Sequence, residues 1–158
     1  MAEVSRLADQ ARRAFAGEAW HGDPINELLR DVDAKTAAAH PIPGAHSIWE
    51  LVLHIAFWDR AVVRRIGGSA VDPTDRENFP AITDSSEAAW NKAVEYAQRT
   101  HDEMVSAIAA FPDSRLNEGV PGKSQQPYYD YFYMFAGIVQ HELYHGGQIA
   151  LLKKAAKP

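Results

Sequence analysis

Apolar and polar residues alternate at helical spacing along most of this chain. In the opening segment, four apolar residues follow one another at steps of three or four: Val4, Leu7, Ala11 and Phe15. Such steps place side chains on one face of a helix. The pattern therefore predicts a helix from about residue 3 to residue 16, where Gly17 ends it.

A short additional helix is predicted next. Asp23 has the character of a helix cap, and Pro24 suits the first helical position, so we expect a helix that runs to about Arg30. Residues 33–39 add another turn or two before a stretch with two prolines, residues 40–44, breaks the pattern.

The second main helix has a clear start. Ser47 and Glu50 stand three residues apart, the spacing of a capping box, in which each side chain accepts a free backbone N–H. The apolar pattern continues to Ile66, and Gly67 and Gly68 follow. Because residues 47–66 are apolar around most of the helix circumference, we expect this helix to be largely buried.

The second half of the chain predicts two more long helices. A capped start at residues 84–87 leads into a seam with steps of four and three, made of Trp90, Val94, Ala97, His101, Met104 and Ile108. This is the spacing of a bundle interface. The last helix is predicted from about Tyr128 to Ala155, and its first half is mostly apolar and aromatic.

These elements define an all-α fold. Four main helices, a short extra helix between the first two, and long loops at residues 69–83 and 113–127 predict a four-helix bundle. The length of 158 residues suits one domain over residues 1–158. The loops are long enough for crossovers, so their lengths leave the bundle topology open.

Composition narrows the classes of function. The formal net charge is −5 with a pI of about 5.8, without the basic face that a general nucleic-acid binder needs. There is no cysteine, which excludes disulfides, cysteine nucleophiles and thiolate metal ligands. We find no signal peptide and no apolar span of transmembrane length, so we expect a cytoplasmic protein that does not enter the membrane.

The strongest chemical signal is His141-Glu142-Leu143-Tyr144-His145. Two histidines four residues apart on a helix project from the same face and can bind one metal ion. The letters also match the His-Glu-x-x-His pattern of zinc peptidases, in which the Glu is the general base. Those enzymes take a third ligand downstream, whereas residues 146–158 contain no His, Asp or Glu. The third ligand must therefore come from upstream.

Three upstream histidines compete for that position. His54 lies in the most apolar helix, where an unpartnered polar ring would cost about 1–3 kcal/mol. His101 lies on the inward seam of the third main helix, and His46 precedes a helix start. The residues alone rank His54 first, then His101, then His46; a hydrogen-bonded core histidine is the alternative for each buried ring.

At this point the chain resembles the DinB-like (DinB/YfiT) superfamily of small helical metal proteins. Three segments, in the same order as in the family, carry the resemblance: Trp20-His21-Gly22, PIPGAHSIWELVLH at residues 41–54, and HELYHGGQIALL at residues 141–152. The resemblance implies a four-helix bundle with a divalent metal on His54, His141 and His145, and it weakens the case for His101. It also implies a homodimer, and for some members a transferase or isomerase activity that uses a low-molecular-weight thiol such as bacillithiol, mycothiol or glutathione.

Three histidines leave coordination positions open on Zn²⁺ or Ni²⁺, which suits catalysis better than pure structure. We therefore expect a metal-dependent enzyme acting on a small molecule, with an external thiol as co-substrate. The alternatives are a hydrolase using activated water, for which Glu142 is the candidate base, and a non-enzymatic module that binds metal or ligand. Neighbouring helical residues point about 100° apart, so Glu142 can also face away from the ion. Trp58, Tyr144 and Gln148 are candidates to line the pocket or to support the metal ligands, and packing is the expected role of Trp58.

Overall fold

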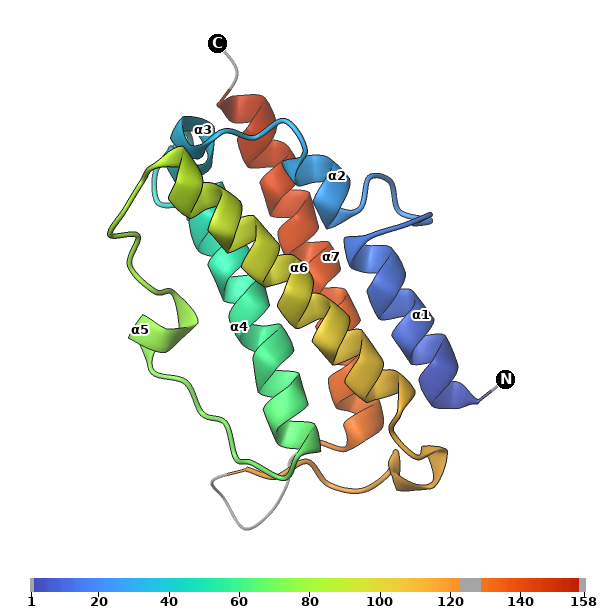
Figure 1. Cartoon of the computed structure of the whole chain (residues 1–158). Helices are drawn as coiled ribbons and strands as arrows, with labels where there is room; N and C mark the ends of the chain where they lie inside the picture. Colours follow the sequence, from blue (N-terminus) through green and yellow to red (C-terminus); the bar gives the residue numbers. More distant parts are fainter. Residues whose placement is uncertain (1, 123–128, 157–158) are drawn as a thin grey trace.

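Four long helices form the molecule, as the sequence predicts. The computed structural model describes residues 2–122 and 129–156. The long helices are α1 (Glu3–Phe15), α4 (Ile48–Ile66), α6 (Glu87–Ala109) and α7 (Tyr131–Ala155). Each packs against two of the others, in the ring order α1, α6, α4, α7. The all-α four-helix bundle is thus confirmed (Figure 1).

The direction of the helices is the feature that the loop lengths left open. In Figure 1, α4 and α6 run in the same direction, and α1 and α7 run in the opposite one. The chain must therefore return along the whole bundle between α4 and α6. Residues 67–86 make this crossover, and they contain the short helix α5 (Asp75–Asn78) beside α4.

The short elements differ in part from the prediction. Helix α2 (Ile25–Leu29) begins one residue later than expected, because Pro24 has an extended backbone and is itself the capping residue; Asp23 does not cap it. Helix α3 (Ala34–Ala38) provides the expected extra turns, capped by Asp33. Helix α5 and the 3₁₀ turn η1 (Asp113–Arg115) were predicted as loop. The last helix begins at Tyr131, capped by Asp130, which is later than the predicted start near Tyr128; Tyr128 itself lies outside the described residues.

The predicted capping devices of the two central helices are present. Ser47 and Glu50 form the full capping box of α4, and Ser86 caps α6 through its hydroxyl. The predicted seam of α6 faces the interior: five of its six residues are buried, and Val94 is partly buried.

The core consists of two apolar clusters with a polar layer between them. One cluster contains Phe15, Ala97 and Ile149. The other contains Ala11, Met104 and Ile138. On three of the helices, a buried ionisable residue lies between the two clusters: Asp59 on α4, His101 on α6 and Glu142 on α7.

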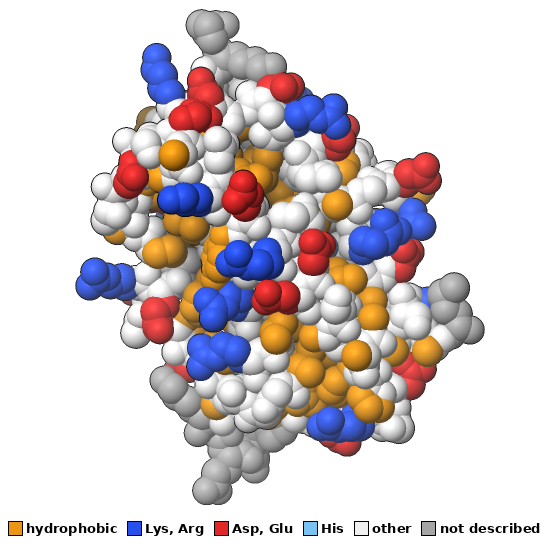
Figure 2. Space-filling model, in the orientation of Figure 1, with side chains coloured by type: hydrophobic (Ala, Val, Ile, Leu, Met, Phe, Trp, Pro, Cys, Tyr) orange, Lys and Arg blue, Asp and Glu red, His pale blue; other side chains and the backbone are white. Residues whose placement is uncertain are grey.

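The surface carries charges of both signs. On the face seen in Figure 2, Lys and Arg side chains alternate with Asp and Glu side chains, with apolar side chains between them. None of the described helices combines the length and the apolar character needed to cross a membrane.

Candidate metal centre

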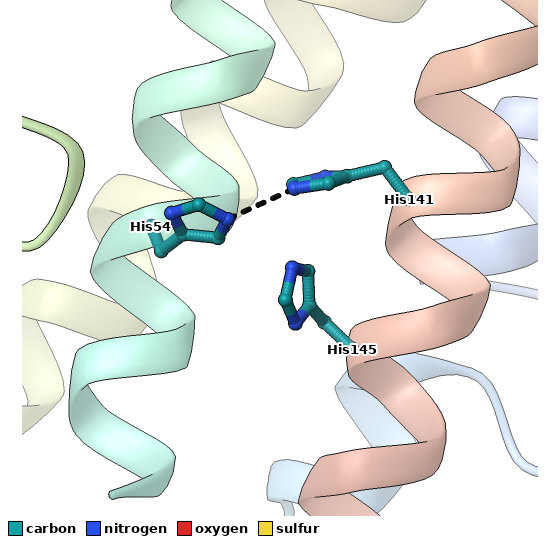
Figure 3. Close-up of side chains that lie close together, drawn as sticks. All are labelled: His54, His141 and His145. Atoms are coloured by element: carbon teal, nitrogen blue, oxygen red, sulfur yellow. Dashed lines mark hydrogen bonds between the residues drawn. The ribbon is translucent and has the colours of Figure 1, made fainter. Parts of the chain in front are cut away.

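His54, His141 and His145 meet across the interface between α4 and α7. The structure places ring nitrogens of all three within 4.8 Å of one another. His54 Nε2 lies 2.9 Å from His141 Nε2, and Figure 3 shows the three rings turned toward one another. The i, i+4 spacing on α7 brings two of the rings together, and the packing of α4 on α7 adds the third.

The outer nitrogens of two rings are held by hydrogen bonds. His54 Nδ1 donates to the backbone oxygen of Asn78 at 3.0 Å, and His145 Nδ1 donates to Gln148 Oε1 at 2.6 Å. A proton fixed at Nδ1 leaves the Nε2 lone pair free for a metal. His141 Nδ1 is buried and has no hydrogen-bond partner among the described residues.

The crossover between α4 and α6 supplies much of this support. Asn78, the last residue of α5, holds His54 through its backbone oxygen and accepts a hydrogen bond from Trp58 Nε1 through Oδ1 at 2.9 Å. The next residue, Phe79, stacks on the His54 ring with centroids 4.3 Å apart. Sequence reasoning missed both residues, because a polar loop carries no periodic signal that tells which side chain will reach the site.

Burial keeps the three rings neutral. It lowers the pKa of His54 to about 4 and, together with the neighbouring His145 and His54, that of His141 to about 3. Burial also lowers the pKa of His145. Neutral imidazole is the form that binds metal, so the centre is ready for a cation at neutral pH.

The donor set fits a divalent metal ion. Two neutral rings whose Nε2 atoms lie 2.9 Å apart have at most one proton between them. A metal ion takes up both lone pairs at once, and the third ring is within reach of the same point. Three imidazoles are a ligand set typical of Zn²⁺, Ni²⁺ and related ions.

A pocket of about 220 Å³ reaches the centre from the α7 side. His141 lines it together with Trp58, Tyr133 and Ile138, so its walls are mostly apolar and aromatic. Arg65 also lines it, with the guanidinium carbon 5.4 Å from the centroid of the Trp58 ring. An apolar small molecule bound here would lie next to a candidate ligand.

The other candidate residues lie elsewhere. His101 is buried on α6, and its Nδ1 is 2.8 Å from Glu142 Oε1. Glu142 is thus directed into the bundle interior, toward α6, and its side chain is fully buried. His46 is exposed and stacks on Phe79. Of the three rivals for third ligand, the structure brings His54 to the pair.

The pocket-wall candidates also have definite positions. Gln148 orients His145, and Trp58 lines the pocket while it donates to Asn78. Tyr144 is 66% exposed and meets the His145 ring edge-on.

The parallel helices α4 and α6, joined by a crossover, and the three histidines between α4 and α7 define the class of this protein. It is a small helical bundle with a candidate metal site. Residues 19–149 match the DinB superfamily, and the chain belongs to this superfamily. Comparisons with curated proteins and with solved structures gave no match.

Proposed function

We propose that this protein is a metal-dependent enzyme that activates a low-molecular-weight thiol and transfers it to a small electrophile. The observation that carries the proposal is the convergence of His54, His141 and His145, with ring nitrogens within 4.8 Å of one another. Structural zinc sites usually have four protein ligands, whereas this centre offers three. Ligand positions therefore remain for a thiol or for water.

Zn²⁺ or Ni²⁺ is the ion that this nitrogen donor set suits best. When bound, such an ion supplies a Lewis acid that lowers the pKa of a bound thiol or water molecule. His54 and His145 present Nε2 because Asn78 and Gln148 hold their Nδ1 protons. The role of the protein is thus to orient three imidazole lone pairs toward one point.

The neighbouring pocket supports thiol transfer to an apolar substrate. Trp58, Tyr133 and Ile138 would exclude water from the substrate and hold its apolar part beside His141. The chain contains no cysteine, so the thiol comes from a second small molecule. A thiol needs no carboxylate base once its pKa is lowered below the pH of the medium.

The hydrolase alternative is less well supported by the position of Glu142. Its carboxylate is fully buried and bonded to His101, so it faces the interior of the bundle instead of a water molecule at the centre. A catalytic role for Glu142 stays a prediction, and the arrangement favours a role inside the core.

The test combines elemental analysis with a thiol-consumption screen. Purified protein should contain Zn²⁺ or Ni²⁺, and His145→Ala should contain one ion fewer per chain and lose all metal-dependent turnover. The screen supplies glutathione, bacillithiol or mycothiol with aryl halides, epoxides and activated alkenes. His21→Ala, which removes an exposed histidine that is not part of the triad, is the matched control and should behave as the parent.

Three results would change the assignment. Full activity of the metal-stripped protein, or unchanged metal content in His145→Ala, would refute the metal centre. Substrate loss without thiol loss would identify a hydrolase. Metal-loaded protein that turns over no electrophile would favour the non-catalytic module.

We also propose a homodimer formed through α7. Large exposed apolar side chains recur along one side of this helix at steps of eleven and seven, where Tyr133, Tyr144 and Leu151 are each more than 60% exposed. Exposed apolar patches often mark interfaces. A cytoplasmic location, where low-molecular-weight thiols are kept reduced, is part of the same proposal.

A further inference from the structure

We propose that the bundle core contains a second divalent-cation site, formed by Asp59, His101 and Glu142. These residues come from α4, α6 and α7, and each offers one ligand atom within 4.8 Å of the others. They form the polar layer between the two apolar clusters. The site is separate from the histidine triad and shares none of its side chains.

Four buried polar atoms of this layer lack a hydrogen-bond partner among the described residues. Both carboxylate oxygens of Asp59, Nε2 of His101 and Oε2 of Glu142 are buried without a hydrogen-bond partner among the described residues. The three side chains are at most 1% exposed. Buried polar groups in folded proteins are nearly always partnered, so four such atoms at one place indicate a missing ligand.

The layer brings two acidic side chains close together. Two carboxyl groups face each other in the core, and among the described residues their one hydrogen-bond partner is an imidazole, with His101 Nδ1 2.8 Å from Glu142 Oε1. Both carboxyl groups are fully buried. A buried charge is costly unless it is paired or bound to a metal. A divalent cation supplies the positive charge that this layer lacks.

The side chains of the layer are held rigidly by the helices that carry them. The His101 ring stacks on Phe15 with centroids 4.4 Å apart, which fixes the ring plane. Asp59 and Glu142 stand on α4 and α7, the two helices that also carry the triad. Ligands from facing helices of a bundle are a common way to build a metal site.

The ligand set predicts which ion binds. Two carboxylates and one imidazole are harder ligands than the three imidazoles of the triad, and they suit Mn²⁺ or Fe²⁺. Mn²⁺ is therefore the probe that best separates the two sites. The competing account is that protons alone neutralise the carboxylates, which requires no ion.

The test uses full-length protein in which the triad has been disabled. His145→Ala, expressed with Mn²⁺ in the medium and incubated with excess Mn²⁺, should retain one Mn²⁺ per chain after desalting. Adding Asp59→Asn should remove this ion. Adding Glu103→Gln instead, which changes an exposed carboxylate on the same helix as His101, should leave it in place.

If His145→Ala retained no Mn²⁺ after desalting, the second site would be refuted. The proposed metal centre on the three histidines would be unaffected. Because the double variant could fail to fold, the parent protein provides a second measurement. Crystals grown with Mn²⁺ should show an anomalous peak between the carboxylates of Asp59 and Glu142. Carboxylate oxygens within hydrogen-bond distance and no peak would show that protons neutralise the layer.

Discussion

The three histidines of the centre differ in how their outer nitrogens are held. Gln148 accepts from His145 and Asn78 accepts from His54, whereas His141 has no such partner among the described residues. A hydrogen bond to the outer nitrogen fixes ring orientation and raises ligand basicity. His145 and His54 therefore have their outer nitrogens fixed, whereas His141 is held through its inner nitrogen, 2.9 Å from His54 Nε2.

Gln148→Leu should weaken metal binding without unfolding the protein. The change removes the acceptor at 2.6 Å from His145 Nδ1. Loss of such a partner typically lowers metal affinity by about 10–100-fold. Titration against a chelator of known affinity measures the effect. Gln140→Leu, an exposed change on the same helix, is the control; equal affinities for the two variants would contradict the role of Gln148.

The buried carboxyl group of Asp59 should make the stability of the protein depend on pH. Burial raises the pKa of Asp59 in the folded protein, so its contribution to stability is lost as the pH rises from the unfolded value of 3.8 through the folded value. Asparagine does not titrate. We therefore expect the free energy of unfolding of the parent, measured in EDTA, to fall relative to that of Asp59→Asn as the pH rises from 5 to 8. The difference should change by at most about 1.4 kcal/mol per pH unit.

Urea unfolding at several pH values measures this gap. His101 lies in the same layer in both proteins, and burial lowers its pKa. A gap that stays constant with pH would show that Asp59 is ionised and stabilised by a partner.

At the scale of elements, the crossover does more than connect α4 to α6. Its helix α5 has only four residues, Asp75–Asn78, yet it has a complete capping box between Thr74 and Glu77. A helix this short has little stability of its own. The cap and the contacts of Asn78 and Phe79 with α4 together hold it against His54.

Thr74→Ala should therefore loosen the metal centre from a distance. Loss of a cap costs about 1 kcal/mol, which here would favour local opening of α5 and reduce metal affinity by at most about fivefold. Asp33→Ala is the matched control, because it removes the cap of α3, which packs on α4 and α6 without reaching the triad. It should reduce stability and leave metal affinity unchanged. If Asp33→Ala lowered metal affinity and Thr74→Ala did not, α5 would have no role in supporting the metal centre.

At the scale of the whole molecule, the outer face of α7 lies beside the pocket. Tyr133 belongs both to the pocket wall and to the exposed apolar stripe with Tyr144 and Leu151. Gly137 and Gly147 lie on the same side, and an added side chain there would meet open space. A second copy packed on this stripe would cover the mouth of the pocket and shield a bound substrate.

The proposed dimer is tested by light scattering at micromolar concentration. The parent should have twice the mass of the chain, and Leu151→Glu should be a monomer because it places a charge in the interface. Trp20→Glu changes a fully exposed apolar residue away from the stripe and should remain dimeric. A monomeric parent would refute the dimer and leave the metal centre as it stands.

The sequence alone determined the features that depend on spacing within one element. The four long helices, the capping box of α4 and the shared face of His141 and His145 all follow from local periodicity. Helical geometry repeats every 3.6 residues whatever surrounds it. The residues ranked His54 first as third ligand, the resemblance to the DinB superfamily pointed to the same residue, and the match over residues 19–149 supports the family.

Tertiary structure decided everything that depends on how elements meet. Residues 69–83 were predicted as a loop, but the crossover that contains them sets α4 parallel to α6 and brings Asn78 to His54. Glu142 is one residue from His141, yet it pairs with His101 on α6. Periodicity relates side chains along a helix, whereas the partner across the core is chosen by the packing of all four helices, which no local pattern records.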